Sequence, residues 1–134
     1  MKDGLSGKMA TTSQECKKGI EKAIGILFLS RTMSHTAHLK TTSYAAHKAL
    51  NEFYDGVVDL ADTLAETAQG LYGILDVPFV NASGNINEPI SLLQGHLKQL
   101  ESCMASCDED YLMNIFQEIQ SLYRSTLYKL TNLS

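Results

Sequence analysis

The sequence has no tryptophan, only two prolines and only three cysteines among its 134 residues. The lack of tryptophan and the scarcity of proline give no support to an all-β fold. An odd number of cysteines does not suit a framework of disulfides and is typical of a protein in a reducing compartment. With 44% hydrophobic and 19% charged residues, the composition and length predict one globular domain with its own core.

Long hydrophobic runs are also missing. The apolar run from Ala23 to Leu29 is too short to span a bilayer, and the charged residues Glu21 and Lys22 precede it directly. It also begins too far into the chain to be a secretory signal. We therefore expect a cytoplasmic protein that has no membrane partner.

Positive charge is scarce, since the formal net charge is −4. This balance argues against a protein whose whole surface binds nucleic acid. The first 22 residues differ, because they hold five lysines and three acidic residues. A flexible N-terminal arm is predicted for residues 1–11. DNA binding by this basic region is an alternative that shift assays at low and high salt would test.

Four helices are predicted for residues 12–134. Thr12 and Glu15 have the spacing of a capping box, which predicts a first helix that runs to about His35. A second helix is predicted from Tyr44 to Leu71, where glycines end it. Pro89 and the acidic run at residues 108–110 mark the starts of the third and fourth helices.

The connection between the second and third predicted helices, Tyr72 to Asn87, is long for a compact domain. Fully extended it would reach roughly 50 Å, whereas the 28 residues of the second helix would span roughly 42 Å. It can therefore cross the whole length of a bundle. This predicts an all-α, ferritin-like four-helix bundle in which the second and third helices run parallel after a long crossover.

No lysine or arginine occurs between Ala49 and Leu97, although seven acidic residues do. Five of these acids fall at steps of three and four residues along the second predicted helix and so form one stripe. Like charges at this spacing destabilise an isolated helix by a few tenths of a kcal/mol per pair. A bound cation would offset that repulsion. The stripe consists of Glu52, Asp55, Asp59, Asp62 and Glu66.

Two members of the stripe combine with two histidines into a candidate iron site. His35, His47, Asp62 and Glu66 supply the imidazole and carboxylate ligands that suit iron. The chain has no Glu-x-x-His motif, which di-iron bundles usually carry on two helices. A complete site inside one bundle is therefore not expected.

The spacing His35-x11-His47-x14-Asp62-x3-Glu66 resembles the ferroxidase motif of the mini-ferritins, or Dps proteins. This resemblance implies that His35 and His47 of one subunit bind two irons together with Asp62 and Glu66 of a twofold-related partner. It also implies a homo-oligomer, at least a dimer and in its fullest form a closed dodecamer-like shell. Such a protein would oxidise Fe(II) and protect against damage by Fe(II) and peroxide.

The sequence departs from the family pattern at several positions. Thr36 stands where the family usually has tryptophan, Lys40 where it has glycine, Asn51 where it often has an acid and Thr67 where arginine is common. These departures leave a second interpretation open. The chain would then be a degenerate mini-ferritin that acts as a structural, regulatory or DNA-associated oligomer without iron oxidation.

Other residues carry weaker patterns. Cys103 and Cys107, four residues apart on the third predicted helix, form a weak candidate metal pair with His96, but core or half-buried thiols are the favoured interpretation. His38 is an accessory-ligand candidate, although a solvent-facing loop position is favoured. Aromatic residues of the fourth helix are predicted to lie in the core or at an interface, namely Tyr111, Tyr123 and Tyr128.

Overall fold

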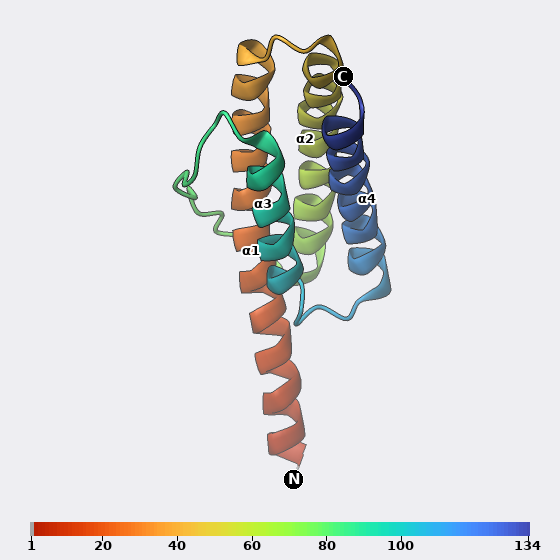
Figure 1. The fold of residues 1–134 in the computed structure, drawn as a ribbon. Helices are drawn as coiled ribbons and strands as arrows, with labels where there is room; N and C mark the ends of the chain where they lie inside the picture. Colours follow the sequence, from red (N-terminus) through yellow and green to blue (C-terminus); the bar gives the residue numbers. More distant parts are fainter. Residues whose placement is uncertain (1) are drawn as a thin grey trace.

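The computed structural model describes the backbone of residues 2–134 and the side chains of residues 12–134. The chain forms four α-helices joined by three connections (Figure 1). They are α1 (Lys2–Lys40), α2 (Tyr44–Tyr72), α3 (Pro89–Cys103) and α4 (Asp110–Asn132). The all-α prediction is confirmed.

The start of α1 differs from the prediction. The helix begins at Lys2, before the capping box at Thr12, and its first turns project beyond the other helices (Figure 1). It also continues past His35 to Lys40. The side chains of the arm predicted for residues 1–11 lie outside the described residues, and its flexibility stays a prediction.

The bounds of α2 agree with the prediction because both ends carry strong local signals. The side chain of Ser43 accepts a hydrogen bond from the Ala46 amide and so caps the first turn. Gly73 ends the helix with a positive φ of 88°, and its amide donates to the Gln69 carbonyl. The long connection then occupies residues 73–88.

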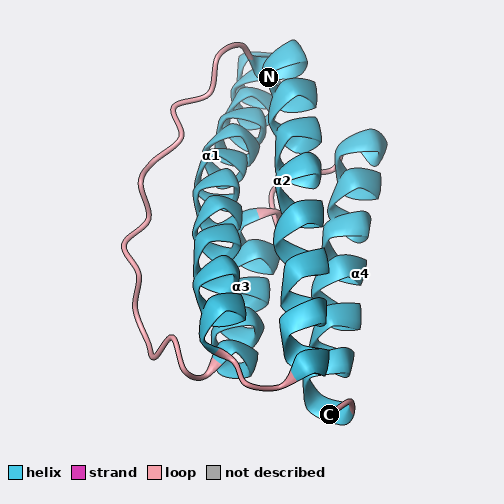
Figure 2. Ribbon diagram, turned by 90° about the horizontal axis from the view of Figure 1, so that it is seen from above, coloured by secondary structure: helices cyan, strands magenta, loops and turns pink. Residues whose placement is uncertain are grey.

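The helices pack as two antiparallel hairpins that share one core. α1 packs against α2 and α3, and α4 packs against the same two helices. The loop of residues 73–88 passes along the outside of α1, so α2 and α3 run in the same direction (Figures 1 and 2). Contacts between side chains agree with this order, because they show that α1 and α3 run antiparallel. Ser30, later in α1, meets His96 within α3, whereas Cys16, earlier in α1, bonds to Cys107 after the end of α3.

Two glycines of α1 allow other backbone segments to approach the helix. A Cβ on Gly25 would lie 2.7 Å from the Pro78 carbonyl oxygen of the crossover loop. A Cβ on Gly19 would overlap the carbonyl oxygen of Cys103 at the end of α3. These glycines therefore have a packing role, in addition to their cost in helix propensity.

Most of the buried side chains are apolar, and a chain of hydrogen-bonded polar groups lies among them. Tyr123 of α4 is fully buried, packs edge-on against Phe53 and donates to the Ser30 hydroxyl at 2.6 Å. The Ser30 Oγ lies 2.6 Å from Nδ1 of buried His96. Burial lowers the pKa of His96 below its ordinary value. Within residues 2–134, none of the helices has the length and apolar character that crossing a membrane requires.

Candidate metal site

Three of the four histidines gather where α1 turns into α2. His35 and His38 lie in the last turns of α1, and His47 lies in the first turn of α2. The prediction that His38 faces solvent is wrong, because only 8% of the residue is exposed. His38 stays within the helix because α1 continues to Lys40, and this places it against α2.

His38 and His47 are paired through both their rings and their backbones. The Nδ1 of His38 lies 2.7 Å from the His47 carbonyl oxygen, and the Nδ1 of His47 lies 3.0 Å from the His38 carbonyl oxygen. The two rings stack with their centroids 3.6 Å apart and their planes 22° from parallel. The pair thus joins the last turn of α1 to the first turn of α2.

This pairing selects one tautomer for each ring. A carbonyl oxygen only accepts hydrogen bonds, so each Nδ1 must carry the hydrogen and donate it. In the neutral imidazole, Nε2 then keeps its lone pair, which is the form that binds a metal ion. His47 is exposed to solvent. Its side chain therefore has the properties of a metal ligand.

His35 belongs to the same cluster through Tyr54. The His35 ring stacks on the Tyr54 ring with centroids 4.2 Å apart, and the His35 and His38 centroids are 6.1 Å apart. The Tyr54 hydroxyl donates to the side-chain oxygen of Asn51 at 2.6 Å. The guanidinium of Arg31 lies 5.7 Å from the Tyr54 centroid. Sequence patterns did not indicate these tertiary contacts.

The two predicted carboxylate ligands lie elsewhere on the same hairpin. Asp62 and Glu66 are one turn apart on α2, and both are exposed. Along the helix axis Asp62 is about 22 Å from His47, at a rise of about 1.5 Å per residue. Across the described side chains, no group of three or more potential metal ligands converges within one chain. One chain therefore places His35 and His47 near the same residue, His38, whereas the two carboxylates lie further along α2.

Among the described residues, the acidic stripe has a positively charged partner at one end only, at Glu52. Lys129 of α4 bonds to Glu52 at 2.9 Å, and this hydrogen bond with the nearby positive charge lowers the pKa of Glu52. Asn51 donates to Asp55 at 3.3 Å. No lysine, arginine or histidine described in the structure forms an ion pair with Asp62 or Glu66. The negative charge at that end of α2 is left open to solvent or to a partner.

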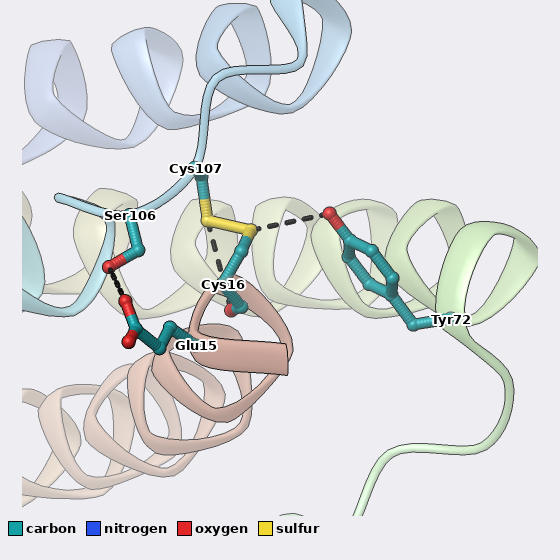
Figure 3. The surroundings of a disulfide bond; sticks show 5 residues. All are labelled: Glu15, Cys16, Tyr72, Ser106 and Cys107. Carbon is teal, nitrogen blue, oxygen red and sulfur yellow. Dashed lines mark hydrogen bonds between the residues drawn. A yellow bond between two sulfur atoms is a disulfide. The ribbon is translucent and has the colours of Figure 1, made fainter. Parts of the chain in front are cut away.

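The cysteines do not form a metal site. Cys107 is not on α3, which ends at Cys103, and it forms a disulfide with Cys16 of α1 (Figure 3). This corrects the expectation that the cysteines are free thiols. Cys103 remains a free thiol, and burial raises its pKa. His96 contacts the core hydroxyl of Ser30 instead of a cysteine.

Comparison with known proteins identifies a family. Residues 38–130 match the model of DUF5856, which is described as a family of unknown function. The chain belongs to this family. The part of the chain that matches DUF5856 includes His47, Asp62 and Glu66, whereas His35 precedes it.

A curated relative of this DUF5856 chain comes from a phage. The chain is 26% identical over 114 residues to an uncharacterized 14.6 kDa protein in the mobD-ri intergenic region of Enterobacteria phage T4. The alignment covers 84% of this chain and 80% of the phage protein. No solved structure matches. The resemblance to Dps proteins thus depends on the residues of the α1–α2 hairpin.

Proposed function

We propose that the protein binds and oxidises Fe(II) at a site formed between two copies of the chain. His35 and His47 of one copy, with Asp62 and Glu66 of the other, would bind two Fe(II) ions as substrate. Glu66 would bridge toward the second iron. A twofold arrangement would create two such sites in each dimer.

The observation that carries this proposal is the division of the ligands along one hairpin. The fifteen positions from His47 to Asp62 correspond to about 60° of rotation at 100° per residue, so both side chains project to similar sides of α2. They are also separated by about 22 Å along the axis. A second α2 packed antiparallel, with its twofold axis near Tyr54 and Asp55, would place each His47 opposite the partner's carboxylate pair.

Two further features support the proposal. The parallel direction of α2 and α3, with the crossover outside α1, is the helix order of ferritin-like bundles. The Nδ1–H tautomer of His47 leaves Nε2 available to a metal ion. Both features belong to the single chain and require neither a partner nor a bound ion.

The chemistry follows from the ligands and from the oxidant. Carboxylates stabilise Fe(III) more strongly than Fe(II), so the site would favour loss of an electron from each iron. Two Fe(II) and one hydrogen peroxide with two protons give two Fe(III) and two water molecules. Because each iron supplies one electron of the pair, the O–O bond breaks without releasing a hydroxyl radical.

A mixing experiment tests the shared site directly. The first variant carries His35→Ala and His47→Ala, and the second carries Asp62→Ala and Glu66→Ala. Alone, each should oxidise Fe(II) with peroxide no faster than buffer, as measured by ferric absorbance. Unfolded and refolded together in equal amounts, they should regain about one quarter of the wild-type sites, since half the dimers are mixed and each of these has one intact site.

The control removes two exposed carboxylates that lie outside α2. Asp76→Ala with Glu118→Ala changes the net charge by the same amount as Asp62→Ala with Glu66→Ala. This control should oxidise iron at the wild-type rate. A monomeric wild-type protein in sedimentation, or refolded mixtures as inactive as their parents, would contradict the shared site.

A second candidate function is a structural oligomer that has lost iron oxidation. Asn51 favours it, because this amide stands where Dps proteins often have an acid and is already bonded to both Tyr54 and Asp55. Metal analysis of the purified protein separates the two candidates. Iron bound in proportion to dimer sites supports oxidation, and its absence after loading with Fe(II) supports the structural role.

A further inference from the structure

We infer that His38 is a positioning residue that holds His47 in the orientation and tautomer needed to bind Fe(II). The inference deepens the proposed function and rests on it, since His47 is a ligand only in that proposal. It assigns a role to a histidine that neither the spacing motif nor the acidic stripe includes. The evidence is the reciprocal contact between the two residues.

His47 alone has little to fix its side chain. It is exposed in the first turn of α2, where a free imidazole would sample several rotamers and let water bond to either nitrogen. Its contacts with His38 change this. The ring of His47 lies flat against that of His38, and its Nδ1 donates to the His38 carbonyl oxygen.

His38 is itself held rigidly, which a positioning residue requires. It is buried, its Nδ1 donates to the His47 carbonyl oxygen at 2.7 Å, and its ring meets Tyr54 edge-on with centroids 5.4 Å apart. The contact thus fixes both the backbone and the ring of His47. Outer groups of this kind typically contribute 10- to 100-fold to metal affinity.

The same geometry argues that His38 is not itself a ligand. Its ring is buried between His47 and Tyr54, whereas His47 is exposed. The described side chains also contain no group of three or more potential ligands around it. Its effect on the metal should therefore be indirect and should depend on the ring that it offers for stacking.

Two substitutions separate stacking from the loss of an imidazole. His38→Phe keeps an aromatic ring beside His47, and His38→Ala removes it. Anaerobic titration with Fe(II) should give an affinity at least 10-fold weaker than wild type for His38→Ala and less than 10-fold weaker for His38→Phe. Leu39→Ala, at an exposed neighbour in the same turn, is the control and should bind as wild type.

Nitrogen NMR of the iron-free protein gives a second measurement that does not depend on iron. Wild-type His47 should carry its hydrogen on Nδ1. His38→Ala keeps the carbonyl oxygen that accepts this hydrogen but loses the stacked ring and the bond to the His47 carbonyl, so the freed His47 ring should leave that oxygen and exchange between both tautomers. Unchanged tautomer and affinity in His38→Ala would overturn the inference. A loss as complete in both variants as in His47→Ala would also overturn it, because His38 would then be a ligand.

These measurements keep the inference and the proposed function distinct. If wild type binds no Fe(II), the proposed function fails whatever the NMR of His47 shows. If wild type binds Fe(II) and His38→Ala binds it equally well, the function stands and the role of His38 is refuted.

Discussion

Reducing the bond between Cys16 and Cys107 should destabilise the protein strongly, because the bond closes a loop across most of the chain. The two cysteines are 91 positions apart and connect α1 to the segment between α3 and α4. Around the bond, Tyr72 donates to Cys16 Sγ at 3.4 Å and Ser106 donates to Glu15 at 3.4 Å (Figure 3). The bond therefore ties α1 to the connection between α3 and α4, which lies at the lower end of those two helices in Figure 1.

The size of the effect follows from the loop that the bond closes. With 91 positions between the sulfurs, the lost freedom of the unfolded chain corresponds to about 4.5 kcal/mol at 25 °C. For a chain of this length, that loss should lower the melting temperature by about 15 °C. The figure is an upper value, because residual structure in the unfolded chain would reduce it.

Calorimetry of the oxidised and reduced proteins at one protein concentration tests this expectation, since assembly also shifts melting temperature. Thiol counting should find one reactive thiol per unfolded oxidised chain, from Cys103, and three after reduction. Cys103→Ser is the control and should keep the full difference. Equal melting temperatures in a protein whose thiol count has changed would refute the loop-closure argument.

Two further expectations concern the packing of α1 and the buried chain in the core. Gly19→Ala should destabilise the fold by about 2 kcal/mol in urea unfolding, because its Cβ would overlap the Cys103 carbonyl. Gly95→Ala should instead stabilise the fold by up to about 1 kcal/mol, because a Cβ at Gly95 would enter open space. Burial lowers the pKa of His96 below its ordinary 6.5. As the pH falls, His96 therefore takes up its proton at a higher pH in the unfolded state than in the folded state. The stability that His96 contributes should be complete above about pH 6.5 and fall as the pH drops below it, by up to about 1.4 kcal/mol per unit. Urea unfolding of wild type and His96→Gln should diverge in this window, and parallel curves would contradict the assignment.

The fold was predictable where its determinants are local. Ser43 and Gly73 bound α2 through a cap and a positive φ, and Pro89 begins α3 at the expected residue. The end of α1 was predicted too early, because the sequence after His35 contains no glycine or proline to stop a helix before the threonines. The helix continues to Lys40, and His38 gains its contacts only because of this extension.

Contacts between distant segments were not predictable from spacing. Three cysteines allow three pairings, and no local signal separates the bond of Cys16 with Cys107 from the others. The helical glycines of α1 suggested only a weaker helix, whereas Gly19 and Gly25 in fact admit the end of α3 and the crossover loop. The stacking of His38 on His47 likewise needs both helices in place.

The acidic stripe gives the clearest physical reason to look for a second copy. Its first member has a cation within the chain, since Lys129 binds Glu52. Asp62 and Glu66 have none among the described residues, and the exposed imidazole of His47 lies too far along the same hairpin to reach them. A partner packed antiparallel would bring its own imidazoles to these carboxylates, and a shared metal ion would then neutralise them. Assembly and metal binding should therefore be linked, so that each strengthens the other by the same free energy.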